Sequence, residues 1–155
     1  MEIATSLLLL LTANGAPVVV AYLMGPKAAW RVDAGWVFFD QQPVLGTSKT
    51  WRGIIAAVAF CWALALLLDY PGVLGIQFAA YAMLGDLLSS FIKRRSHIPP
   101  SGKMTGLDQA PEALLPLLFL RQELSLGLAE IAVVVMVFIL LDEGLTRWLS
   151  RWRVR

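Results

Sequence analysis

The sequence predicts an all-α, polytopic membrane protein. Five transmembrane helices are expected to form one domain over residues 1–155, with the N-terminus outside and the C-terminus in the cytoplasm. Hydrophobic residues make up 58% of the chain and charged residues only 15%, whereas soluble domains carry about 25% charged residues. The hydrophobic residues gather in five long runs, and most basic residues lie between those runs. This composition excludes a disordered chain and argues against a soluble enzyme, because so small a globule cannot bury so much apolar surface.

Each apolar run is a candidate spanning helix, and the runs cover about residues 3–24, 53–68, 73–92, 107–120 and 124–141. A spanning helix needs about 20 apolar residues. The first, third and fifth runs meet this length, the second needs its flanking residues, and the fifth can continue toward Trp148. The fourth run is short, contains Glu112 and is interrupted by Pro111 and Pro116. We therefore expect a short, tilted or partly re-entrant helix that its neighbours cover.

Asn14, Gly15 and Pro17 interrupt the middle of the first run. The break is interpreted either as a kink whose backbone groups neighbouring helices satisfy, or as an opening that lines a cavity. In both cases the amide of Asn14 should face protein, because a polar group at membrane depth is costly when it faces lipid.

The Lys and Arg residues predict the orientation of the helices. All of them except Arg121 follow the first, third or fifth run. The positive-inside rule then places both long loops and the C-terminus in the cytoplasm of a multi-pass plasma-membrane protein. This orientation needs an odd number of crossings, which favours a crossing by the short fourth run. The stretch from Arg147 to Arg155, with Trp148 and Trp152, is predicted to anchor at the headgroup layer.

A polar stripe marks the cytoplasmic end of the third run. On a helix, the spacing i, i+3, i+4 and i+7 gives one face to Asp86, Ser89, Ser90 and Lys93, with Arg94 beside it. An ionisable group at membrane depth is usually functional or paired. The alternative to a functional site is an internal pair between Asp86 and Lys93.

A second group of polar residues opens the fourth run. Asp108 and Glu112 stand at i and i+4 on a helix, with Gln109 close by. Asp108 is therefore either a site residue or simply the cap of the helix N-terminus. Paired with Asp86, it would supply oxygen ligands of the kind that Mg²⁺ prefers.

The stretch 46–53 combines small residues, hydroxyls and two cations, Lys49 and Arg52, before a helix. Backbone N–H groups at a helix start, together with such cations, attract phosphate. The Walker A spacing is absent, so the alternative is a basic loop at the membrane interface. Cations beside Mg²⁺ ligands are the components of phosphoryl or nucleotidyl transfer, and a membrane location suggests a lipid substrate.

Four short stretches, taken in order, resemble the CDP-archaeol synthase family. They are Asn14-Gly15-Ala16-Pro17, Lys49-Thr50-Trp51-Arg52-Gly53, the stretch from Gly85-Asp86 to Lys93-Arg94-Arg95, and Leu107-Asp108-Gln109. The stretch 90–94 also matches the S-x-x-K-R core of the related phosphatidate cytidylyltransferases. The resemblance covers almost the whole chain.

This resemblance implies five transmembrane helices around a charged cavity, where CTP and a membrane lipid phosphate react to give a CDP-lipid and pyrophosphate. Its cofactor would be Mg²⁺, held by Asp86 and Asp108, and these two residues with Lys93 would be catalytic. The partners would be CTP, the lipid phosphate and the bilayer, with no nucleic acid. The implied substrate-binding residues are Asn14, Lys49, Thr50, Arg52, Ser89, Ser90, Arg94, Arg95 and Gln109.

A non-enzymatic membrane protein is the alternative interpretation of the same residues. Asn14, Asp86 and Glu130 could serve an ion path in a small transporter or mark a lipid-binding scaffold. Glu130, near the outer end of the fifth run, has a simpler explanation as a partner of Arg121. A transporter should also show internal repeats, and the sequence has no visible repeat.

Overall fold

The computed structural model describes residues 2–99, 106 and 108–152, and for 145–152 it describes the backbone only. The predicted all-α class and the five helices are confirmed. The helices are α1 (Glu2–Met24), α2 (Trp51–Leu67), α3 (Gly72–Arg95), α4 (Gln109–Phe119) and α5 (Leu128–Trp152). Leu107, Lys103 and the side chains of the predicted C-terminal anchor lie outside the described residues.

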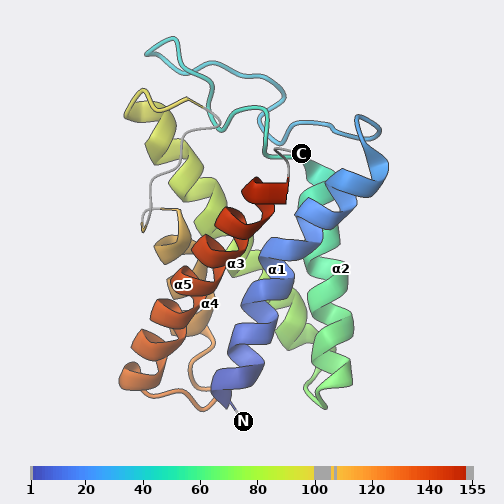
Figure 1. Cartoon of the computed structure of the whole chain (residues 1–155), viewed down its shortest axis with the longest axis vertical. Coiled ribbons are helices and arrows are strands. Elements are labelled where there is room, and N and C mark those ends of the chain that lie inside the picture. The colour runs from blue at the N-terminus through green and yellow to red at the C-terminus, as the bar shows by residue number, and fades with distance from the viewer. Residues whose placement is uncertain (1, 100–105, 107, 153–155) are drawn as a thin grey trace.

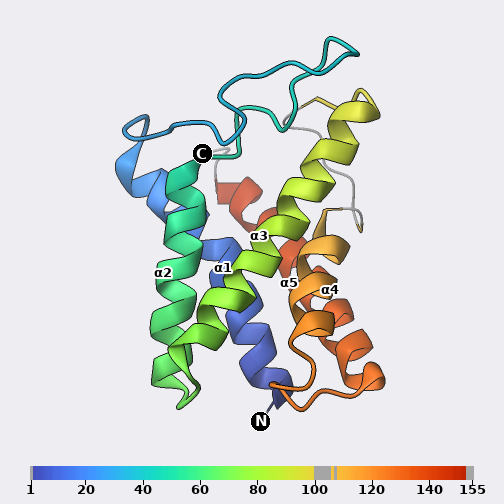
Figure 2. The same cartoon turned by 180° about the vertical axis from the view of Figure 1, so that it is seen from behind.

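The five helices form one bundle in which each helix runs opposite to the one before it (Figures 1 and 2). As a result, α1 begins at one end of the bundle and α5 finishes at the other. The long connection 25–50 lies at the end where α1 and α3 finish and α2 begins. This end therefore carries the 25–50 connection and the basic last turn of α3, with Lys93, Arg94 and Arg95.

Not every helix is long enough to cross a bilayer alone. Among the described residues, α1 and α3 have the length and apolar character of a membrane span, while α2 is apolar but has 17 residues. Helix α4 has 11 residues, or about 16 Å, against about 30 Å of hydrocarbon core. The expected short fourth helix is thus confirmed, with Pro116 inside it.

The first helix agrees with its predicted bounds, whereas the start of the fifth helix differs. Helix α1 is continuous through Asn14 and Pro17, and the amide of Asn14 donates to the carbonyl of Leu10 (3.0 Å). The fifth helix begins four residues later than expected, because Leu124 and Leu126 lie in the connection before it. Both leucines are buried, so their apolar character reflects the core and not a helix.

Two glycines on α3 allow its neighbours to approach closely. A Cβ added at Gly75 would lie 2.2 Å from the carbonyl oxygen of Cys61 on α2. A Cβ at Gly85 would lie 2.3 Å from the carbonyl oxygen of Pro111 on α4. Small residues commonly allow such backbone contacts between membrane helices. Cys61 is fully buried at the first contact, and its thiol lies 3.6 Å from the carbonyl oxygen of Leu9.

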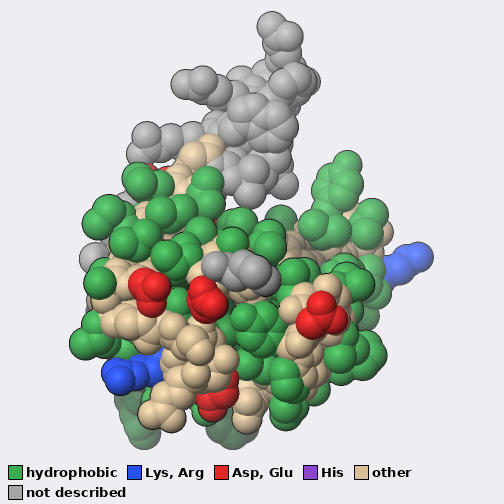
Figure 3. All heavy atoms as spheres, turned by 90° about the horizontal axis from the view of Figure 1, so that it is seen from below, with side chains coloured by type: hydrophobic (Ala, Val, Ile, Leu, Met, Phe, Trp, Pro, Cys, Tyr) green, Lys and Arg blue, Asp and Glu red, His purple; other side chains and the backbone are tan. Residues whose placement is uncertain are grey.

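The end opposite the 25–50 connection has few basic residues. Figure 3 looks onto this end and shows mainly hydrophobic side chains, with acidic groups scattered among them. The expected pairing of Glu130 with Arg121 is not seen among the described residues. Glu130 instead accepts a hydrogen bond from the backbone N–H of Gly127 (2.7 Å), just before the first residue of α5.

Candidate active site

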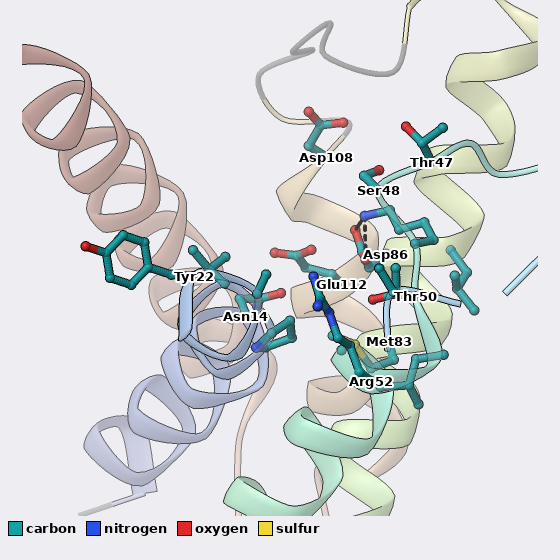
Figure 4. A pocket seen from close by; sticks show the side chains of 18 of the residues that line it. Asn14, Tyr22, Thr47, Ser48, Thr50, Arg52, Met83, Asp86, Asp108 and Glu112 are labelled. Atoms are coloured by element: carbon teal, nitrogen blue, oxygen red, sulfur yellow. Dashed lines mark hydrogen bonds and ion pairs between the residues drawn. The ribbon is translucent and has the colours of Figure 1, made fainter. Parts of the chain in front are cut away.

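A cavity of about 710 Å³ opens between the helices near the end that carries the 25–50 connection. All five helices and this connection contribute to its wall (Figure 4). One part of the wall is apolar, with Pro17, Val18, Ala21 and Tyr22 from α1. The facing part is polar and carries Lys49, Thr50, Arg52, Asp86, Asp108, Gln109, Glu112 and Asp142.

The sequence predicted that Asp86 and Asp108 would approach each other, and both line this one cavity (Figure 4). They come from different segments: Asp86 lies on α3, while Asp108 immediately precedes α4. The contact of Gly85 with Pro111 explains their proximity, because it presses the start of α4 against α3 next to Asp86. The site therefore depends on a glycine at residue 85, because any side chain there would push α4 away from α3.

Each of the two aspartates is held by a lysine. The ammonium of Lys49 lies 2.6 Å from both carboxylate oxygens of Asp86. The ammonium of Lys93 lies 2.6 Å from Oδ1 of Asp108. The alternative of an internal Asp86–Lys93 pair is thus wrong, since each of these residues has its ion-pair partner on another segment.

The capping alternative for Asp108 is also not supported. Asp108 does occupy the position before α4, but it makes no side-chain capping hydrogen bond there. Its backbone is helical, with φ −75° and ψ −47°, whereas a capping residue normally has extended dihedral angles. The carboxylate is therefore oriented toward Lys93 and the cavity wall.

Gln109 connects the start of α4 to α5. Its Oε1 accepts from the backbone N–H of Gly106 (3.0 Å), and its Nε2 donates to Asp142 (2.9 Å). The sequence prediction did not single out Asp142, which follows the apolar part of the fifth run and resembles an ordinary polar helix end. Only its partner across the bundle distinguishes it.

The connection 25–50 delivers Lys49 to the cavity. An isolated antiparallel bridge joins Arg31 to Thr50, and the N–H of Val32 donates to the carbonyl of Lys49 (2.9 Å). Asp33 holds the segment before Lys49 in place, because its carboxylate accepts hydrogen bonds from the N–H groups of Leu45 (3.0 Å) and Gly46 (2.9 Å).

A third backbone donor, Gly35, also reaches Asp33 (3.0 Å). Partial burial opposes ionisation of the Asp33 carboxyl, but the hydrogen bonds from Gly46, Leu45 and Gly35 outweigh it and hold the pKa below its usual value. The carboxylate form is therefore the one that organises this segment.

The remaining predicted binding residues are distributed unevenly. Asn14, Thr50 and Arg52 line the cavity, and Arg52 also donates to the carbonyls of Gly25 (2.7 Å) and Lys27. The other predicted residues are not among those that line the described cavity: Ser89, Ser90, Lys93, Arg94 and Arg95.

Ser89, Ser90 and Arg94 are instead buried in the bundle next to the site, and the hydroxyl of Ser89 donates to the carbonyl of Asp86 (3.0 Å). Arg95 binds the 25–50 connection: it donates to Asp40 (2.8 Å) and to the carbonyl of Pro43 (2.7 Å). These contacts give Arg95 a structural function whether or not it also meets a substrate.

The donor set of the cavity suits a hard divalent cation. Among the described residues, the acidic side chains that line it are Asp86, Asp108, Glu112 and Asp142, and the basic ones are Lys49 and Arg52. Carboxylate oxygens with phosphate oxygens from a substrate are the usual ligands of Mg²⁺. In the described part of the chain, however, no three His, Cys, Asp or Glu side chains form a ready metal cluster. The residues thus fit a cation that arrives together with phosphate groups.

Known proteins with similar sequences share one name. No protein-family model matches the chain. A CDP-archaeol synthase of Hyperthermus butylicus is 37% identical over 105 residues, which are 64% of this chain and 60% of that protein. That of Staphylothermus marinus is 32% identical over 69% of this chain and 61% of its own length. The chain therefore matches about 60% of the length of these two relatives.

Another relative matches more completely. The CDP-archaeol synthase of Saccharolobus islandicus is 34% identical over 116 residues, covering 70% of this chain and 69% of that protein. A solved structure described as an intramembrane enzyme for archaeal membrane lipid biosynthesis superposes with a TM-score of 0.74 at 26% identity. It covers 92% of this chain and 90% of its own. The chain accordingly belongs to the CDP-archaeol synthase family.

Proposed function

We propose that the chain transfers a cytidylyl group from CTP to a membrane lipid phosphate and so forms a CDP-lipid and pyrophosphate. The observation that carries this proposal is the single cavity in which Asp86 and Asp108 face Lys49 and Arg52, with an apolar wall opposite. Such a cavity offers charges to a nucleotide and hydrocarbon to a lipid. Its relatives' name supports the same activity.

The reaction would be an in-line displacement at the α-phosphorus of CTP. An oxygen of the lipid phosphate forms the new P–O bond, and the bond to the bridging oxygen breaks to release pyrophosphate. The second pKa of a phosphate monoester is about 6, so the nucleophile is largely ionised at neutral pH. A strong general base is not required, and the barrier is mainly the repulsion between two anions.

The cations of the cavity would lower that barrier. Lys49 and Arg52 are positioned to contact phosphate oxygens, and preorganised cations of this kind stabilise developing charge. When substrate replaces the carboxylate on Lys49, Asp86 becomes available as a ligand. Asp86 and Asp108 would hold Mg²⁺, which would neutralise charge on the transferring phosphate. Lys93 would keep Asp108 oriented.

The acceptor is proposed to be a lipid of the archaeol type, from the names of the relatives. Val18 and Tyr22 line the cavity on α1, and each side chain is more than half exposed. This dual exposure suits a substrate whose tails stay in the membrane. A diacylglycerol-type phosphate has the same headgroup chemistry, so the tails must be distinguished by experiment.

The cavity is proposed to open toward the cytoplasm of a five-helix plasma-membrane protein, with the N-terminus outside. The basic connections gather at the cavity end of the bundle, and the opposite end has few cations. This is the distribution expected from the positive-inside rule. It also gives the cavity direct access to cytoplasmic CTP.

A product assay tests the proposal. The purified protein in liposomes is given radiolabelled CTP, Mg²⁺ and either an archaeol-type or a diacylglycerol-type phosphate, and the lipid fraction is analysed for CDP-lipid. We expect labelled product with the archaeol-type acceptor and none with EDTA. Absence of CDP-lipid with every acceptor, from protein that binds CTP, would overturn the assignment. Glu130→Gln, which lies at the other end of the bundle, is the matched control and should retain activity.

A further inference from the structure

Within the 25–50 connection, residues 31–50 fold back on themselves as a hairpin that is held by isolated antiparallel bridges and contains turns and bends. Its arms are joined by backbone hydrogen bonds from Val44 to Trp36 (3.0 Å) and from Phe38 to Gln42 (2.8 Å). An isolated bridge between Val37 and Pro43 lies between them. The turn is therefore at residues 38–42, and we call residues 36–42 the hairpin tip. It lies at one end of the bundle (Figure 1).

The hairpin tip exposes large apolar side chains. Phe39 is 96% exposed, Trp36 74% and Val37 61%. Contiguous apolar groups of this kind are unusual on a surface that faces only water. Because hydrogen bonds fix the backbone of the tip, the exposed groups cannot be explained as an unfolded segment.

Both acidic side chains of the hairpin, Asp33 and Asp40, are engaged by contacts within the protein. Asp33 accepts three backbone hydrogen bonds, and Asp40 is paired with Arg95 at 2.8 Å. The guanidinium of Arg95 also lies over the rings of Phe38 (4.6 Å) and Phe91 (5.0 Å). An apolar tip whose carboxylates are paired can approach an anionic membrane surface at low cost.

The hairpin tip is continuous with the outer surface of α3. The ring of Phe38 packs edge-on against Phe91, with centroids 5.6 Å apart. The same helix exposes Leu84, Leu88 and Ile92 at i, i+4 and i+8, an apolar stripe that faces outward in this intramembrane fold. Because Phe91 is the neighbour of Ile92 on α3, the tip contacts the helix next to the end of this stripe.

We propose that the hairpin tip is a membrane anchor whose Trp36, Val37 and Phe39 insert into the boundary between lipid headgroups and acyl chains. Aromatic side chains concentrate at this depth in membrane proteins, and apolar groups of interfacial segments enter it by about 5–10 Å. The same hairpin carries Lys49 and Thr50, so the anchor fixes the cavity wall against the bilayer surface. This inference requires the membrane fold but not the proposed reaction.

Depth-dependent fluorescence quenching tests the anchor without any turnover. In a Cys61→Ala background, a cysteine is introduced by Val37→Cys and labelled with the fluorophore NBD. The labelled protein is placed in nanodiscs with lipids that carry a nitroxide on carbon 5 of an acyl chain. Thr47→Cys, on the same connection at the exposed rim of the cavity, is the matched control position.

We expect the lipid nitroxide to quench the label at residue 37 several-fold more than the label at residue 47, and aqueous iodide to give the reverse order. Adding Phe39→Asp should release the residue-37 label toward water, whereas Phe39→Leu should leave it in place. Equal quenching by the lipid nitroxide at both positions would overturn the proposal. So would self-quenching between labelled copies that is the same with and without the lipid nitroxide. The second result would identify the tip as a contact between two copies of the chain.

Discussion

Two ion pairs join the 25–50 connection to α3, and their surroundings differ. Lys49 lies 2.6 Å from Asp86, and Arg95 lies 2.8 Å from Asp40. In both pairs the side chains are about one-fifth to one-third exposed, so burial does not distinguish them. The difference lies in the other contacts that each cation makes.

Arg95 makes several structural contacts through its two terminal nitrogens and the face of its guanidinium. Besides Asp40, it donates to the carbonyl oxygens of the connection and covers two aromatic rings. Lys49 gives its ammonium to a single carboxylate at the wall of an open cavity. The comparison teaches that a cation with one partner at a cavity can exchange that partner for a substrate, while a cation with many partners holds a fold. Distance alone would rank the two pairs as equals.

The strongest test breaks the cavity pair. Asp86→Asn removes the charge that Lys49 balances and a ligand for the cation that accompanies CTP. We expect CDP-lipid formation to fall by a factor on the order of 1000, with insertion and thermal stability nearly unchanged, as measured by product assay and by unfolding in detergent. A variant with normal turnover would remove Asp86 from the mechanism.

The next test separates α3 from α4 beneath the cavity. Gly85→Ala places a Cβ against the backbone of Pro111, and we expect a loss of about 1–3 kcal/mol in the free energy of unfolding, as for other overpacked cores. Activity should fall as well, because Asp108 moves with α4. Gly144→Ala, where a Cβ meets nothing within 4 Å, is the control and should be neutral. Equal stability of the two variants would show that the helices separate without cost.

A smaller effect is expected when the second ion pair is altered. Arg95→Lys retains the charge but loses the planar group that bonds two carbonyls and stacks on Phe38. We expect a loss of about 1 kcal/mol in stability and faster proteolysis of the hairpin, measured by limited trypsin digestion. If Arg95 binds substrate phosphate, as the family resemblance implies, KM for CTP will instead rise while proteolysis stays constant.

The smallest effect concerns Asp33, which joins the two arms of the hairpin by accepting from Leu45 and Gly46. Its pKa is below the usual value, so its contribution is complete above the ordinary aspartate pKa and is lost as the pH falls through the lowered value. Hydrogen exchange at Leu45 and Gly46, corrected for intrinsic rates, should show protection at neutral pH that disappears in acid. Asp33→Asn should lack this acid step. An identical pH profile in both proteins would contradict the assignment.

Much of the fold can be predicted from the order of apolar runs and basic residues along the sequence. The apolar runs and their intervening cations predict five helices and the end of the bundle at which Asp86 and Asp108 lie. An apolar run alone cannot distinguish a helix from a buried connection, so it wrongly predicts that the fifth helix includes Leu124 and Leu126. Their burial depends on packing that no local pattern encodes.

The partners of the charged residues could not be predicted in the same way. Lys93 shares a helix face with Asp86, but it pairs with Asp108 because α4 is pressed onto α3 at Gly85. Asp142 lines the cavity and accepts from Gln109 across the bundle, and neither fact is visible in its local sequence. Such pairings depend on how segments distant in sequence meet, and the sequence pattern leaves them open.

Because Cys61 is buried, the accessibility of its thiol reports opening of the helix bundle in the native protein. Its sulfur is enclosed where α1, α2 and α3 meet, and it is the only cysteine in the sequence. A maleimide can reach it only when these three helices part. The rate of Cys61 alkylation in intact liposomes would therefore measure how often the helices separate transiently, in lipid and without denaturant.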